Sequence, residues 1–92
     1  MKKILFSSVI NEILKRERGI SFSEIAEAVD RNAVIRILKN PNQKDYKGQR
    51  FMIVNINQYA YVVPLKETET EVIWITIFPS RKYTKKFIKN LK

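Results

Sequence analysis

The sequence predicts an α+β fold with two N-terminal helices, a four-stranded antiparallel sheet and a C-terminal helix. Apolar residues recur every three or four positions up to about residue 30, as they do on one face of a helix. Four short runs between residues 33 and 78 are rich in β-branched residues and are separated by polar turns. Helical spacing returns after residue 79. The 92 residues suit a single domain, 1–92, with one modest core.

Two helices are predicted at the N-terminus. The first covers residues 4–17, and its apolar stripe consists of Phe6, Val9, Ile10, Ile13 and Leu14. Gly19 follows, and glycine readily adopts the left-handed conformation that ends a helix. The second helix begins after Ser21, which has the capping-box spacing with Glu24. We expect this helix to end near residues 31–32.

The first predicted strand covers residues 33–38, and a polar loop over 41–48 follows it. The runs 51–56 and 59–65 are separated by Asn57 and Gln58 alone, which predicts a tight hairpin. Because both faces of this hairpin are largely apolar, we expect it to lie in the middle of the sheet.

A two-residue turn also predicts the register of the hairpin. Val54 then lies opposite Tyr61, and Met52 lies opposite Val63. Pro64 has no N–H group to donate, so we expect it near a strand end or a bulge.

The last predicted strand covers residues 72–78, and the C-terminal helix begins after Pro79. Ser80 is suited to cap this helix. Tyr83, Phe87 and Leu91 fall four apart, which predicts one apolar side that packs on the sheet.

The charge of the chain is strongly positive: 18 basic and nine acidic residues give a formal net charge of +9. This balance favours nucleic acid as a partner, ahead of an anionic membrane or an acidic protein. No window approaches the ~20 apolar residues that span a bilayer, and the apolar run near the N-terminus is too short for a signal peptide. We therefore expect a cytoplasmic protein with no membrane partner.

Several kinds of chemistry are excluded by what the chain lacks. It contains no cysteine and no histidine, so it has no disulfide, no thiol nucleophile and no histidine-dependent nucleophile system. Its carboxylates are not paired at metal-ligand spacing, which argues against a two-metal nuclease. It also lacks a P-loop and a GxGxxG motif. We expect neither a metal nor a cofactor.

The positive charge is concentrated at the C-terminal end, where no acidic residue follows Glu71. Six cations lie in that stretch: Arg81, Lys82, Lys85, Lys86, Lys89 and Lys92. Ammonium and guanidinium groups displace counterions from phosphates, so this end is a candidate RNA-binding site. Ser80 and neighbouring amides are expected to contribute N–H groups, and Arg50 is expected to join from the second strand.

RNA supplies its own nucleophile, the 2′-hydroxyl, so a protein without metal or histidine can still cleave it. Arg81 is the candidate for stabilising the charge of the transition state, and Tyr83 or Lys82 is the candidate for proton transfer. Arg50, Ser80, Lys85 and Lys86 are the candidates for binding the RNA backbone. The expected products carry a 2′,3′-cyclic phosphate and a 5′-hydroxyl.

Other interpretations stay open at this stage. The basic helix is equally explained as a solvated face whose apolar side docks on the sheet. Aromatic residues that could stack on bases are Tyr59, Tyr61, Trp74 and Tyr83, although Tyr61 and Trp74 are more typical of a core. The chain can also be a non-catalytic nucleic-acid-binding module, or an interaction protein with an acidic partner.

Four segments, in this order and spacing, resemble BrnT-type toxins of type II toxin–antitoxin systems, within the RelE-like superfamily. They are Arg18-Gly19-Ile20-Ser21-Phe22, Gly48-Gln49-Arg50, Tyr61-Val62-Val63-Pro64, and Pro79-Ser80-Arg81-Lys82 followed by Thr84-Lys85-Lys86. The resemblance implies a RelE-like fold, a ribonuclease that inhibits translation, and a ribbon-helix-helix antitoxin that covers the basic site. It also implies a functional arginine at the junction of strand and helix, where Arg81 lies. The lysine-rich end departs from the arginine-rich ends of that family, and lysine lacks the bidentate grip on phosphate.

Overall fold

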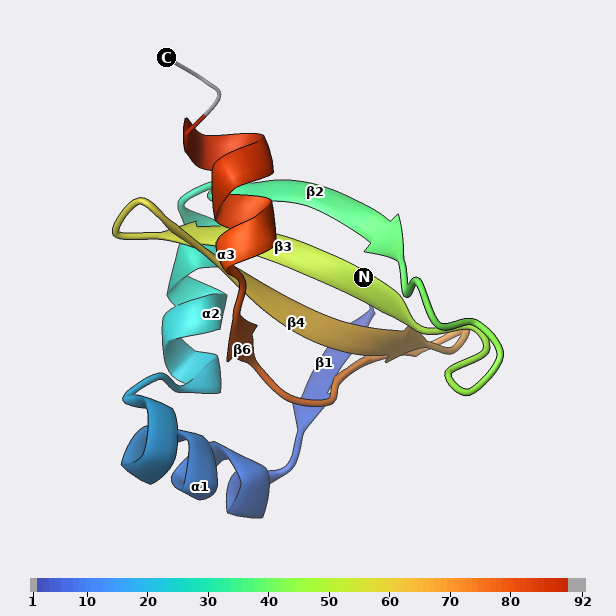
Figure 1. Cartoon of the computed structure of the whole chain (residues 1–92). Coiled ribbons are helices and arrows are strands. Elements are labelled where there is room, and N and C mark those ends of the chain that lie inside the picture. The colour runs from blue at the N-terminus through green and yellow to red at the C-terminus, as the bar shows by residue number, and fades with distance from the viewer. Residues whose placement is uncertain (1, 90–92) are drawn as a thin grey trace.

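The computed structural model describes residues 2–89, which form an α+β fold with a six-stranded mixed sheet (Figure 1). The elements in chain order are β1 (Lys3–Phe6), α1 (Ser8–Arg18), α2 (Phe22–Asp30), β2 (Val34–Lys39), β3 (Arg50–Ile56), β4 (Tyr59–Glu67), β5 (Glu71–Trp74), β6 (Phe78–Pro79), α3 (Arg81–Tyr83) and the π-helical turn η1 (Thr84–Ile88). We call α3 and η1 together the C-terminal helix. Among the described residues, no helix is long and apolar enough to cross a membrane.

The sheet has the strand order β1-β5-β4-β3-β2, and β6 pairs with β4 beside β5. The β1–β5 pair is parallel, and all the other pairs are antiparallel. The α+β class is therefore confirmed, but the prediction of a four-stranded, purely antiparallel sheet is wrong. Two differences account for this: an N-terminal strand, and a last strand that is divided in two.

The N-terminal strand replaces the first turn of the predicted helix 4–17. Residues Lys3 to Phe6 pair with Glu71 to Trp74, and α1 begins only at Ser8. Ser7 caps α1, because its Oγ accepts a hydrogen bond from the Ile10 N–H at 3.3 Å. A cap at this position ends the extended segment and starts the helix. The Phe6 ring then packs on the Phe22 ring of α2, with 4.7 Å between ring centroids.

The predicted ends of α1 and α2 agree with the structure. Gly19 has φ of 66° and ends α1 in the left-handed conformation. The Ser21 side chain accepts a hydrogen bond from the Glu24 N–H at 3.3 Å and so caps α2. α2 ends at Asp30, one residue before the predicted boundary.

The predicted strand 72–78 is divided into β5 and β6, and Pro64 gives the physical reason. The Pro64 carbonyl accepts a hydrogen bond from the Ile75 N–H at 2.9 Å, but proline has no N–H to return. The ladder therefore ends, and pairing resumes only where Val62 lies opposite Phe78. Residues 75–77 leave the sheet between these points, and Ile77 is completely buried. Pro64 thus marks an interruption on one edge of β4 rather than an end of β4.

The central hairpin is confirmed in detail. Asn57 and Gln58 have φ of 54° and 66°, the left-handed values of a two-residue hairpin turn. Val54 pairs with Tyr61 and Met52 pairs with Val63, as predicted. β3 and β4 both have neighbours on each side, so the hairpin is central.

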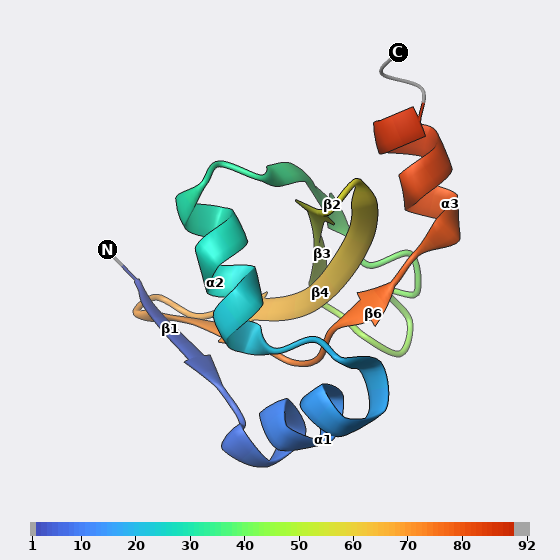
Figure 2. The same ribbon diagram turned by 90° about the vertical axis from the view of Figure 1, so that its left-hand side faces the viewer.

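Each face of the sheet has its own core, and Figure 2 shows α2 and the C-terminal helix on opposite sides of the sheet. The helix α2 and Leu14 of α1 cover one face, and Trp74 of β5, which is 3% exposed, belongs to the core beneath them. The C-terminal helix covers the other face through Tyr83, Phe87 and Ile88, which pack on Ile53, Ala60 and Val62. The predicted apolar side of this helix is therefore confirmed for Tyr83 and Phe87, whereas Leu91 and Lys92 lie outside the described residues.

Candidate nucleic-acid interface

The start of the C-terminal helix is fixed to the β3–β4 hairpin by two residues, Ser80 and Thr84. Ser80 donates its N–H to the Ala60 carbonyl at 2.9 Å, and its Oγ caps the helix by accepting from the Tyr83 N–H at 3.1 Å. The buried Thr84 hydroxyl accepts from the Ala60 N–H at 2.8 Å and donates to the Ser80 carbonyl at 2.7 Å. Ser80 is thus a structural cap, and its own N–H is not free for a phosphate.

One side of this helix faces an open groove of about 420 Å³. We call it the Arg81 groove, and its lining consists of Tyr59, Arg81, Thr84, Lys85 and Lys89. Residues 81, 85 and 89 recur every four positions, so their side chains lie along one side of the helix. Three cations and the Tyr59 phenol therefore share one concavity, while the Thr84 hydroxyl is already paired within the fold. Of the predicted site residues, the structure brings Arg81 and Lys85 together here.

A second group of cations lies against the rings on the helix. Lys82 Nζ lies 5.5 Å from the centre of the Tyr83 ring, and Lys86 Nζ lies 5.5 Å from that of Phe87. The Arg36 guanidinium of β2 lies 5.0 Å from the Phe87 ring. We call Arg36, Lys82 and Lys86 the Arg36 flank. Arg36 was missed from sequence, where its one signal is that it is the only charge inside the apolar run 33–38.

Tyr83, the predicted proton-transfer residue, is largely buried. Its side chain is only 7% exposed and stacks on Phe87, with the centroids 5.7 Å apart and the ring planes at 11°. The tyrosine that lines the Arg81 groove is instead Tyr59, at the start of β4. The sequence had marked Tyr59 only as a possible base-stacking residue.

Arg50 does not join the basic helix. Ala60, to which the helix is attached, pairs with Asn55, five residues along β3 from Arg50. At about 3.3 Å per residue, Arg50 and Asn55 are roughly 17 Å apart along β3. The prediction that Arg50 joins the basic helix is therefore wrong, because β3 places Arg50 opposite Leu65, at the other end of the strand from Ala60's partner.

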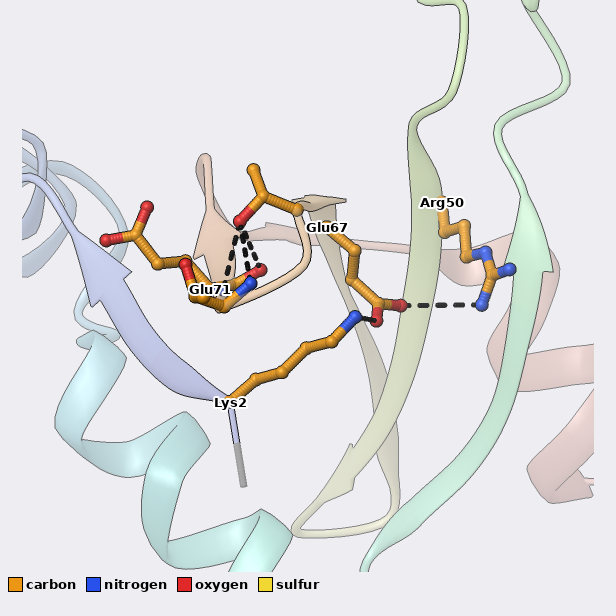
Figure 3. Close-up of polar contacts among 6 residues, drawn as sticks. Lys2, Arg50, Glu67 and Glu71 are labelled. Carbon is orange, nitrogen blue, oxygen red and sulfur yellow. Dashed lines mark hydrogen bonds and ion pairs between the residues drawn. The ribbon is translucent and has the colours of Figure 1, made fainter.

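At that end, Arg50 belongs to a separate ionic cluster, which Figure 3 shows with its partners. Its Nη1 lies 3.5 Å from Glu67 Oε1, and Lys2 Nζ lies 2.7 Å from Glu67 Oε2. The hydrogen bond from Lys2 and the positive charge of Lys2, followed by that of Arg50, hold the pKa of the Glu67 carboxyl below its usual range. Arg50 therefore shares one carboxylate with Lys2 and lies apart from the cations of the C-terminal helix.

The described residues contain no group of three or more His, Cys, Asp or Glu side chains that could hold a metal ion. The sequence matches no protein-family model, and no similar curated protein or solved structure is found. The chemistry of the Arg81 groove and the Arg36 flank therefore carries the functional argument.

Proposed function

We propose that the chain binds RNA at the Arg81 groove and cleaves it without a metal ion, as a toxin that inhibits translation. The observation that carries this proposal is the joint lining of one groove by Arg81, Lys85 and Tyr59. The groove offers a planar bidentate donor, a second cation and a phenol within one concavity. No acidic residue after Glu71 opposes these charges within the segment.

The reaction uses the 2′-hydroxyl of the RNA as nucleophile. Its oxygen bonds to the adjacent phosphorus, the bond from phosphorus to the 5′-oxygen breaks, and a 2′,3′-cyclic phosphate and a 5′-hydroxyl result. The proton of the 2′-hydroxyl passes to a solvent water molecule, and the departing 5′-oxygen receives a proton from a group in the groove. Arg81 stabilises the added negative charge on the phosphoryl oxygens through its fork of N–H donors.

Proton transfer falls to the groups that line the groove. The Tyr59 phenol and the Lys85 ammonium are both able to donate to the departing oxygen. Tyr83 is the weaker candidate, because its ring is packed in the core. Lys82, the other predicted residue, lies with the Arg36 flank and is better suited to holding the RNA backbone, together with Lys86.

A ribbon-helix-helix antitoxin is the proposed partner that keeps the site silent. Two features support it: the resemblance of the motifs to toxins of the BrnT type, and a basic surface that a partner must cover to block RNA. Sequencing the open reading frame next to the gene tests whether such a partner exists. A short frame that encodes a ribbon-helix-helix protein is expected there.

Incubation of the purified protein with RNA in EDTA tests the cleavage. We expect products with cyclic phosphate ends. Arg81→Ala is expected to abolish cleavage without unfolding the chain, since Arg81 is exposed. Arg16→Ala is the matched control, because it removes the same charge from the exposed surface of α1. Loss of cleavage in both variants, or in neither, would remove Arg81 from the site.

A second candidate is a non-catalytic RNA-binding module. The burial of Tyr83 favours it, because binding needs only the exposed cations of the groove and the flank. Binding without cleavage, weakened steeply by salt, is the result expected for this candidate. The logarithm of the binding constant falls with the logarithm of the salt concentration, with a slope of about 0.7 per phosphate contacted on a single strand. Because Arg81→Ala loses one such contact, this slope is expected to be measurably shallower in the variant.

A further inference from the structure

A second cavity lies where the last strand is divided. It measures about 370 Å³, which is at the small end of the range for small-molecule sites. It is lined by aromatic and amide side chains, and those that matter here are Asn40, Tyr46, Gln49, Phe51, Thr76 and Phe78. We call it the aromatic pocket. It exists because residues 75–77 leave the sheet at Pro64 instead of continuing along β4.

Three aromatic rings line this pocket, and two of them pack on each other. Phe51 and Phe78 meet edge to face, with 5.8 Å between centroids and 79° between planes. Tyr46 belongs to the 41–48 loop, and its backbone is fixed by hydrogen bonds at both sides: its N–H donates to the Asn42 carbonyl and its carbonyl accepts from the Gln49 N–H. Its side chain is nevertheless 49% exposed. An exposed ring on a hydrogen-bonded loop, lining the same cavity as two further rings, is a surface for stacking.

The amides supply an edge that hydrogen bonds. Asn40 is 6% exposed, and its Nδ2 donates to Gln49 Oε1 at 3.4 Å, while its Oδ1 accepts from the Asn42 N–H at 2.9 Å. Gln49 accepts through its amide oxygen, so its two side-chain N–H groups can donate to a ligand. With the Thr76 hydroxyl, the pocket offers donors and acceptors next to aromatic walls. Flat heteroaromatic rings with polar edges match both features.

The pocket is adjacent to the Arg36 flank on the same face of the sheet. Arg36 pairs with Ile53, and Ile53 pairs with Val62, so these three side chains form one row across the strands. Leu38, Phe51 and Pro64 form the next row, two residues along, or about 7 Å away. A phosphate bound at Arg36 is thus close enough to Phe51 for the base of the same nucleotide to contact the Phe51 ring.

We propose that the aromatic pocket binds one base of the RNA, while the Arg36 flank holds the phosphate next to it. The proposal rests on the proposed RNA binding and adds a base-recognition site that is separate from the Arg81 groove. Stacking supplies affinity for any base, and the amides of Asn40 and Gln49 provide discrimination between bases.

The test compares two five-nucleotide RNAs with 2′-O-methyl groups, which block cleavage: one carries bases and the other is abasic throughout. Tyr46→Ala is expected to weaken binding of the base-bearing RNA about tenfold and to leave the abasic RNA unchanged. Tyr46→Phe keeps the ring and is expected to bind as the unmodified protein does. Arg81→Ala is expected to weaken both RNAs. An equal effect of Tyr46→Ala on the two RNAs overturns the pocket but leaves the RNA-binding proposal intact.

If the unmodified protein binds neither RNA, the proposed function fails, and the pocket is then judged separately. Nucleoside monophosphates are added to ¹⁵N-labelled protein. Shifts confined to the amides of Gln49, Phe51 and Phe78, and absent in Tyr46→Ala, support a base pocket. Unchanged spectra overturn it.

Discussion

Thr84→Val is the sharpest test of how the C-terminal helix is held. The substitution keeps the shape of the side chain and replaces the hydroxyl with a methyl group. Thr84 is 1% exposed, and its Oγ1 is the acceptor for the Ala60 N–H. Ala60 is itself completely buried, so its N–H has no access to water. The Ser80 carbonyl is affected less, because it also accepts from the Thr84 N–H at 3.1 Å.

The cost is therefore that of one buried, unpaired donor. Such a donor costs about 1–3 kcal/mol, and the added methyl group offsets a small part of this. For a domain of this size, each kcal/mol lowers the melting temperature by roughly 4–8 °C. A loss of about 2 kcal/mol thus corresponds to a decrease of about 8–16 °C.

Thermal unfolding measures the global effect, and amide hydrogen exchange measures the local one. In Thr84→Val the Ala60 amide is expected to exchange faster relative to Val62, which lies on the same strand. Thr84→Ser is the matched control: it loses a methyl group, at about 1 kcal/mol, but keeps the hydroxyl that protects Ala60. The hydroxyl does not hold the helix if Thr84→Val has the same melting temperature as the unmodified protein. The same conclusion follows if the Ala60 amide exchanges equally fast in Thr84→Val and Thr84→Ser.

Three further predictions concern other parts of the chain. Because the pKa of Glu67 is lowered, its pairing with Lys2 stabilises the fold at pH values above the usual carboxyl pKa. This stabilisation is lost as the pH falls through the lowered pKa. In Lys2→Met, an NMR titration should find the pKa of Glu67 closer to its ordinary value. Gln58→Gly removes the strain of a left-handed backbone, about 1–2 kcal/mol, but it also increases the conformational entropy of the unfolded chain, which offsets part of this gain. Urea unfolding should therefore show that the free energy of unfolding rises by about 0.5–1 kcal/mol. Phe22→Ala empties a fully buried site between Phe6 and Trp74 and should cost about 3–5 kcal/mol, with tryptophan fluorescence shifted to the red.

The parts of the fold that the sequence predicts are those fixed by neighbouring residues. The hairpin follows from two turn residues between apolar runs, and its register follows from the length of the turn. The caps at Ser21 and Ser80 depend on contacts three residues away, so their spacing alone is informative. The basic helix is of the same kind, because helical periodicity places Arg81 and Lys85 on one side.

The parts that were missed depend on distant partners. β1 pairs with β5 across 68 positions, Lys3 with Glu71, and its residues also continue a helical periodicity. Only the partner strand decides between the two conformations. Arg50 was misplaced for a related reason, since the sequence shows that it opens a strand but not where the strand's other end lies. Arg36, on an adjacent strand, was overlooked although its guanidinium reaches Phe87.

The division of the predicted last strand also produces the aromatic pocket. A continuous strand over residues 72–78 would pair with β4 along its whole length and leave no room for a cavity. Pro64 prevents this, because it accepts from Ile75 but cannot donate in return. The chain then leaves the sheet, places Thr76 and Phe78 at the aromatic pocket, and returns to deliver Ser80 against Ala60. The missing N–H group of Pro64 therefore accounts both for the aromatic pocket and for the path of the chain that leads to Ser80, where the C-terminal helix begins.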